Sequence, residues 1–163
     1  MSQADLSDLI KQPSVELDEA DVPVSARTQA RRVALQALYQ WQMNQTEPYL
    51  IEKHFFDLGW LSSQIDREWF RELLTQVSAQ ADALDTLYAA YLDRHVKMIN
   101  PVERSILRMA TYELQTQMQI PYRVVINEAV ELSKRFGAED GHKYINGVLD
   151  KVAKQLRPLE FSV

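Results

Sequence analysis

Arginine, glutamine and tyrosine side chains recur near the start of the chain at spacings that bring them together on a helix. Arg32, Gln36 and Tyr39 stand at i, i+4 and i+7, so they share one face, which we expect to lie opposite the core and in solvent. Arg27 and Arg31, four residues apart, flank this face. A guanidinium group can bind a phosphate through two hydrogen bonds, and an exposed tyrosine ring can stack on an unpaired base. The pattern is typical of a surface for single-stranded RNA, although a solvated helix face could carry the same residues.

A second polar stripe lies near the C-terminus. Lys143, Gly147, Lys151 and Lys154 recur at intervals of three or four residues, with Tyr144 at the border of the stripe. Glycine inside a helix costs about 1 kcal/mol relative to alanine, so we expect either RNA or a neighbouring helix to approach the backbone at Gly147. The stripe is a second candidate RNA surface, and the alternative is a solvated lysine face.

Groups that could carry catalysis or hold a metal ion do not form a pattern in this sequence. The chain has no cysteine, which excludes disulfides, thiolate catalysis and cysteine-ligated zinc. Its three histidines, at positions 54, 95 and 142, are far apart, and no pair has the i, i+4 spacing of a helical metal site. Neither a glycine-rich phosphate loop nor a nucleophile elbow occurs. We therefore expect a protein that is not an enzyme, with no catalytic residue, no cofactor and no metal.

The net charge of −5 over 163 residues argues at first sight against a nucleic-acid partner. The first 24 residues account for all of it, because they hold six acidic residues and a single lysine. They also contain two prolines and no aromatic residue, so we predict that residues 1–24 form an acidic, disordered tail. The tail could shield the basic helix from unwanted RNA or aid solubility. The rest of the chain is neutral overall and can carry basic patches.

The sequence also bears on the cellular compartment. The N-terminus lacks the basic start and the apolar run of a secretory signal. No apolar stretch approaches the ~20 residues that a membrane span requires. We expect a cytoplasmic protein with no membrane partner.

The elements that must position these groups are all predicted to be helices. Ser25 is a good N-cap for the first helix, and Asn100 followed by Pro101 is a strong helix start. Gly137 should end one helix and Asp140 should cap the next. Together with the spacing of apolar residues, these signals predict about seven helices, at 25–43, 48–57, 62–77, 81–94, 101–118, 125–136 and 141–157. The fold class is all-α, a helical bundle with short connections.

Four segments resemble the NusB family. FGAEDGHKYINGVLDK, from Phe136 to Lys151, is similar to the family's C-terminal signature, and ARTQARRVALQALYQW, from Ala26 to Trp41, is similar to its arginine-bearing first helix. NPVERSILRMATYEL and IPYRVVINEAVELSKRFG resemble the two helices that precede the signature. The resemblance covers about residues 25–158. The stretch 47–82 matches only by its pattern, and the acidic extension lies outside the family pattern.

The resemblance implies a fold, a function and partners. The fold would consist of two helical subdomains, about 25–80 and 81–163, packed roughly perpendicular. The protein would form a heterodimer with NusE, a protein of the small ribosomal subunit. Together the two would bind the single-stranded boxA RNA element of nascent ribosomal RNA transcripts and promote assembly of the antitermination complex on RNA polymerase. A homodimer is possible when NusE is absent.

The resemblance also implies site residues. Those that match RNA-binding positions are Arg27, Arg31, Tyr39, Lys143 and Tyr144. The helix pattern adds Arg32 and Gln36 to this set, and Glu103 and Arg104 look like part of the NusE-facing surface. The sequence departs from the family where a run of arginines is common, since Thr28 and Gln29 follow Arg27. Arg32 could restore the charge.

Three alternatives remain at this stage. NusB-like domains also occur fused to RNA cytosine methyltransferases, but such an enzyme needs a cofactor domain and a catalytic cysteine that this sequence lacks. A helix-turn-helix DNA regulator would need a basic recognition helix, for which Arg104 and Arg108 alone are too little. A scaffold that binds only proteins is harder to separate from the RNA-binding reading.

Overall fold

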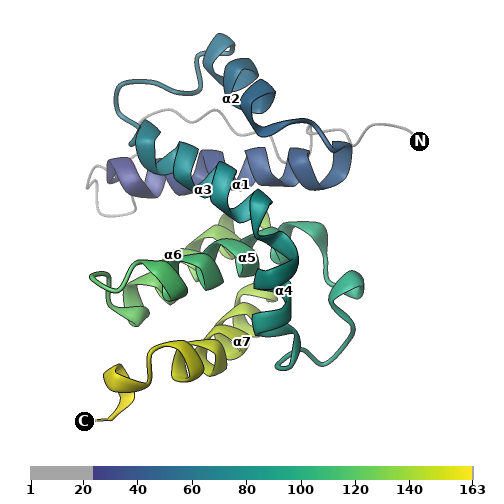
Figure 1. Ribbon diagram of the computed structural model, residues 1–163, viewed down its shortest axis with the longest axis vertical. Coiled ribbons are helices and arrows are strands. Elements are labelled where there is room, and N and C mark those ends of the chain that lie inside the picture. Colours follow the sequence, from purple (N-terminus) through teal and green to yellow (C-terminus); the bar gives the residue numbers. More distant parts are fainter. Residues whose placement is uncertain (1–23, 163) are drawn as a thin grey trace. The chain divides into compact units, whose positions relative to one another are not determined.

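The computed structural model describes residues 24–162, and every regular element in this range is a helix (Figure 1). Seven α-helices and two short 3-10 helices occur there, so the prediction of an all-α fold is confirmed. The acidic tail predicted for residues 1–24 lies outside the described residues except for Val24. The chain divides between Ala79 and Gln80 into two compact units, each of which has its own core.

The first unit contains α1 (Ala26–Asn44), α2 (Pro48–Asp57) and α3 (Arg67–Ala79), each in contact with the other two. Phe55 of α2 and Phe70 of α3 are fully buried, with ring centroids 6.4 Å apart. Full burial of a large apolar side chain stabilises a fold by roughly 1.5–3 kcal/mol. This core fixes α2 and α3 on α1.

The second unit contains α4 (Ala81–Ala89), α5 (Pro101–Thr116), α6 (Tyr122–Phe136) and α7 (Gly141–Leu156), with 3-10 turns η2 (Val96–Met98) and η3 (Pro158–Phe161). Helix α5 contacts α4, α6 and α7 and is the central helix of this unit. The apolar sides of α6 and α7 face inward, where Val125, Leu132, Ile145 and Leu149 are buried. The opposite sides of α6 and α7 are therefore free to carry polar groups.

Two helix starts follow the sequence prediction. Ser25 Oγ accepts a hydrogen bond of 3.1 Å from the Thr28 N–H at the start of α1. Asn100 Oδ1 accepts one of 2.8 Å from the Val102 N–H at the start of α5. Each side chain satisfies a backbone donor that the helix leaves unpaired, and both N-cap predictions are confirmed.

Helix α3 begins at Arg67, and the prediction of a start at Ser62 or Ser63 was wrong. The carboxylate of Asp66 accepts a hydrogen bond of 3.0 Å from the Trp69 N–H, as an N-cap does. The serines that precede it lie in irregular backbone.

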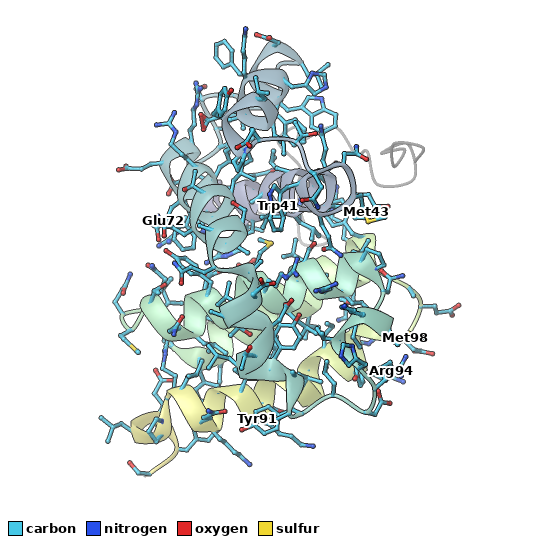
Figure 2. All side chains as sticks on the ribbon, turned by 45° about the vertical axis from the view of Figure 1, so that its right-hand side comes forward. Trp41, Met43, Glu72, Tyr91, Arg94 and Met98 are labelled. Carbon is cyan, nitrogen blue, oxygen red and sulfur yellow. The ribbon has the colours of Figure 1, made fainter. Side chains whose placement is uncertain are left out.

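Helix α4 ends at Ala89, five residues before the predicted end at Arg94. Contacts distant in sequence explain the early end. The Tyr91 hydroxyl donates a hydrogen bond of 2.7 Å to Gln155 Oε1 on α7, and Tyr91 lies beside α7 in Figure 2. These contacts hold the chain after α4 against α7 in a non-helical path.

Helix α5 ends at Thr116 rather than at the predicted Met118. The guanidinium group of Arg157, which is only 4% exposed, lies at this end of α5. It donates hydrogen bonds of 2.6 Å to the Leu114 carbonyl and 2.8 Å to the Gln117 carbonyl. A buried cation at the negative end of a helix satisfies carbonyls that have no partner within the helix.

The residues that connect α6 and α7 lie where the sequence predicted them, but they do not cap the helices in the predicted way. Gly137 does follow the end of α6, but its backbone is extended rather than left-handed. A Cβ at Gly137 would lie 2.8 Å from the Ser133 carbonyl oxygen, so close approach is what requires glycine there. Asp140 precedes α7 as predicted, with φ of 65°, but its side chain makes no capping hydrogen bond.

Candidate nucleic-acid interface

Two arginines at the start of α1 lie next to the indole ring of Trp69. The Arg27 guanidinium carbon is 4.1 Å from the ring centroid and that of Arg31 is 5.9 Å from it. Trp69 lies in the first turn of α3. Asp66, which precedes this helix, holds it against α1, because its N–H donates a hydrogen bond of 3.1 Å to the Ala26 carbonyl. A guanidinium over an aromatic face is attracted by the ring quadrupole and keeps its N–H donors in its own plane. The start of α1 therefore presents a fixed cation.

The face of α1 that we predicted to be exposed is partly buried. Gln36 is 1% exposed and Arg31 is 4% exposed, whereas Arg27, Arg32 and Tyr39 are half-buried. The prediction of solvent exposure was wrong for Gln36, and Arg31, which flanks this face, is buried as well. The prediction assumed a single buried stripe, but residues 33–38 are all buried, so this stretch has no solvent face. The Gln36 amide donates a hydrogen bond of 3.3 Å to the Arg32 carbonyl. That these side chains bind RNA stays a prediction.

On the second unit, the Tyr144 hydroxyl is bound to the segment that follows α4. It donates a hydrogen bond of 2.9 Å to Asp93 Oδ1 and accepts one of 3.2 Å from the Asp93 N–H. Arg94 donates two hydrogen bonds to the same carboxylate, at 2.7 and 3.0 Å, and its guanidinium carbon lies 5.3 Å from the Tyr144 ring centroid. Figure 2 shows Arg94 on this segment. The three side chains form one polar cluster.

Interactions within this cluster shift the pKa values of Asp93 and Tyr144. Hydrogen bonds from Arg94 and then from Tyr144 lower the pKa of Asp93 to about 2. Partial burial, together with the hydrogen bond to the Asp93 carboxylate, raises the pKa of Tyr144 above its ordinary value. Tyr144 is therefore a neutral hydroxyl and Asp93 a carboxylate at neutral pH.

Beside this cluster, α7 lines a groove of about 280 Å³. Its lining residues are Tyr91, Asp93, Lys143, Tyr144, Gly147, Val148 and Lys151. A Cβ at Gly147 would meet no atom within 4 Å, so no other helix among residues 24–162 approaches the backbone there, and the alternative of a neighbouring helix was wrong. That RNA approaches this backbone stays a prediction. The Lys143 side chain is 75% exposed, with Asp140 3.6 Å away. The groove combines an open backbone, two lysines and an aromatic edge, which suits a polyanionic strand.

Glu103 and Arg104 at the start of α5 lie in different surroundings. Burial raises the pKa of Glu103, and the charge of Arg94 opposes this effect. The Glu103 carboxylate packs so closely against Gly141 that a Cβ at this glycine would clash with it. Arg104 points to Asp85, to which it donates a hydrogen bond of 2.9 Å. That either residue faces a partner protein stays a prediction.

Asp85 of α4 also pairs with Arg108. The Arg108 Nε and Nη2 atoms donate hydrogen bonds of 2.8 and 2.7 Å to its two carboxylate oxygens, and the Tyr88 hydroxyl donates one of 2.5 Å. Burial alone would raise the pKa of Asp85, but these bonds and the one from Arg104 outweigh burial and lower it. Arg104 and Arg108 thus hold α4 against α5, which removes the basic pair on which a DNA-reading helix would have depended.

Sequence reasoning missed several members of these sites. Asp93 and Arg94 fall in the predicted helix 81–94, which in fact ends before them, and Trp69 was not singled out as a site residue. Their roles depend on contacts across the fold, for which the local sequence carries no signal. Trp69 alone could have been suspected, since it follows Asp66, a residue type favoured at N-caps, by three positions.

The described residues contain no group of three or more His, Cys, Asp or Glu side chains that could hold a metal ion. In the same range, no helix is both long enough and apolar enough to cross a lipid bilayer.

Comparison with known proteins gives consistent matches. The sequence profile of the NusB family matches residues 28–154. The transcription antitermination protein NusB of Hydrogenovibrio crunogenus is 56% identical over 155 residues, covering 95% of this chain and 96% of that protein. The protein of the same name from Pasteurella multocida is 49% identical over 133 residues, covering 82% and 92%.

Solved structures show the same fold. NusB of T. maritima aligns with a TM-score of 0.71 and 29% identity, over 84% of this chain and 97% of that one. A structure of the antitermination factors NusB and NusE in complex with dsRNA aligns with a TM-score of 0.70 and 24% identity, over 77% and 94%.

Proposed function

The chain belongs to the NusB family, and from this membership we propose that it binds the boxA element of nascent ribosomal RNA together with NusE and promotes assembly of the antitermination complex on RNA polymerase. It is a transcription antitermination protein and not an enzyme. We expect the protein to act in the cytoplasm.

The observation that carries the proposal is the match over nearly the whole length of both chains to proteins named for transcription antitermination. The groove at Gly147 supports the proposal. Open space lies over the helix backbone at Gly147, and Lys143, Lys151 and Tyr144 flank it, which suits the binding of a phosphate–ribose chain. The Arg27 guanidinium stacked on Trp69 supports it on the first unit.

Each candidate surface offers only a few cations, so we expect the protein alone to bind RNA weakly. With three or four phosphate contacts, the slope of log affinity against log salt would be roughly −2 to −3 for a single strand. NusE would add contacts to the same strand, and the affinities for RNA and for NusE would rise by the same factor.

A direct test measures binding of the full chain to fluorescently labelled boxA RNA and to a scrambled strand of equal composition, with and without purified NusE. We expect NusE to raise affinity for boxA much more than for the scrambled strand. Equal affinity for both strands in the presence of NusE would contradict the proposal. If the chain bound NusE but neither strand, the alternative of a scaffold that binds only proteins would hold instead.

Deletion of residues 1–24 tests the proposed roles of the acidic segment. A shielding role predicts tighter binding to the scrambled strand after deletion. A role in solubility alone predicts unchanged RNA affinity and earlier aggregation.

A further inference from the structure

A second groove, of about 410 Å³, lies between α6 and α7. The two helices are joined by residues 137–140 and pack along each other, which makes them an antiparallel helical hairpin. The volume falls within the range of small-ligand sites, roughly 300–1,000 Å³. Its lining combines an apolar floor, side-chain amides and cationic ends.

The floor and the amides suit a planar heterocycle. Ile126, which is 6% exposed, and Val130 give an apolar surface on α6. Asn127 of α6 and Asn146 of α7 are exposed and line the groove, and neither amide has a hydrogen-bond partner among residues 24–162. Each amide offers two N–H donors and a carbonyl acceptor, the groups that read the edge of a nucleobase.

The cations lie toward opposite ends of the groove because the helices are antiparallel. Arg123 is in the first turn of α6 and Lys143 in the first turn of α7. Arg123 Nε donates a hydrogen bond of 3.1 Å to the Tyr122 hydroxyl, and its terminal nitrogens remain available for a phosphate. Asp150 contributes a carboxylate to the lining, which can accept a hydrogen bond from an exocyclic base amine.

We propose that the groove between α6 and α7 holds one unstacked nucleobase of a bound single strand of RNA, with Asn127 and Asn146 bonded to its edge and with Arg123 and Lys143 contacting the phosphates on either side. This inference rests on the proposed function and adds sequence discrimination to it. Phosphate contacts position a strand but carry no sequence information, so a site that reads base edges is needed for boxA to differ from other RNA.

The test compares two double variants of the full chain, with NusE present, for binding to boxA RNA and to the scrambled strand. Asn127→Ala with Asn146→Ala should lower the preference for boxA about tenfold while leaving the salt slope unchanged, because only base contacts are lost. Arg123→Gln with Lys143→Gln should weaken both strands equally and make the salt slope shallower by roughly 1.4. Gln64→Ala, an exposed amide on the first unit, is the matched control and should bind as the native chain does.

The outcomes separate this inference from the function on which it rests. If the asparagine variant keeps the native preference while the native chain distinguishes the two strands, the groove does not read a base and the inference fails alone. If the asparagine variant instead loses affinity for NusE in the absence of RNA, the groove is a protein contact and the inference is overturned. If the native chain does not distinguish the strands, the proposed function fails. Circular dichroism of each variant checks that helix content is unchanged.

Discussion

The Tyr144 hydroxyl donates a hydrogen bond of 2.9 Å to the Asp93 carboxylate across 51 positions of sequence. This bond places the tyrosine ring at the edge of the Gly147 groove and connects α7 to the segment after α4. We therefore expect the ring and the hydroxyl to have separable roles, with the ring contacting RNA and the hydroxyl positioning the ring.

Substitutions at Tyr144 separate these roles. Tyr144→Ala should weaken boxA binding by roughly five- to a hundredfold, the range measured for loss of one base–aromatic stack. Tyr144→Phe keeps the ring and should retain most of the affinity, with a small loss of stability because Asp93 loses one hydrogen bond. Fluorescence anisotropy and urea unfolding measure the two effects. Equal loss of RNA affinity in both variants would show that the hydroxyl, not the ring, matters for binding.

Substitutions at Gly147 should affect the stability of the protein and its RNA binding in opposite directions. Because a Cβ there meets no atom within 4 Å, Gly147→Ala should raise the free energy of unfolding by about 1 kcal/mol through helix propensity alone. Gly147→Gln should also fold, but its side chain would block the groove and lower RNA affinity about tenfold, or 1.4 kcal/mol. Urea unfolding and RNA titration of the same preparations measure both effects. A destabilised alanine variant would mean that glycine is required by the fold.

The sequence predicted the features of the fold that depend on neighbouring residues. Ser25 and Asn100 cap helices because the partner N–H groups lie two or three residues away, and the apolar spacing follows from the helix period. The end of α4 depends instead on Tyr91 meeting Gln155, 64 positions later. No local pattern contains that contact.

The same distinction applies to the candidate site. Lys143 and Tyr144 line one groove with Gly147 and Lys151, because the helix period alone places them on one side of α7. That they bind RNA stays a prediction. Gln36 was predicted to be exposed from a helix projection that assumes one buried side, and its 1% exposure shows that α1 is covered more widely. Burial of a polar residue depends on surfaces that a single helix does not reveal.

Loss of Asp85 should destabilise the second unit strongly. Its carboxylate receives hydrogen bonds from Arg104, Arg108 and Tyr88, so Asp85→Asn leaves two arginines without their counter-charge. Removing one partner of a buried ion pair costs about 3–5 kcal/mol. Urea unfolding at pH 7 measures this cost. A loss below 1 kcal/mol would mean that water replaces the carboxylate.

The same residue predicts a dependence of stability on pH. The pKa of Asp85 is lower in the folded protein than in the unfolded chain, so its stabilisation is complete above the unfolded pKa of about 3.9. As the pH falls below this value toward the folded pKa, unfolding takes up a proton and the stabilisation is lost. The difference in unfolding free energy between native chain and Asp85→Asn should therefore narrow from pH 7 to pH 3. A constant difference over that range would contradict the assignment.

Substitutions at Arg157 and Lys154 test whether the buried cation that follows α7 supports the fold rather than RNA binding. The Arg157 guanidinium donates hydrogen bonds to the carbonyls of Leu114 and Gln117 at the end of α5, and a lysine cannot reproduce its planar set of donors. Arg157→Lys should therefore lower the free energy of unfolding by about 3 kcal/mol, since buried carbonyls lose their partners. Lys154→Gln, which removes an exposed cation three residues earlier, should leave the unfolding free energy nearly unchanged.

At a temperature where both variants are folded, Arg157→Lys should bind boxA RNA with native affinity and native salt slope, because its charge is conserved and faces α5. A loss of boxA affinity in the folded Arg157→Lys variant would place the guanidinium group in contact with RNA and contradict a purely structural role.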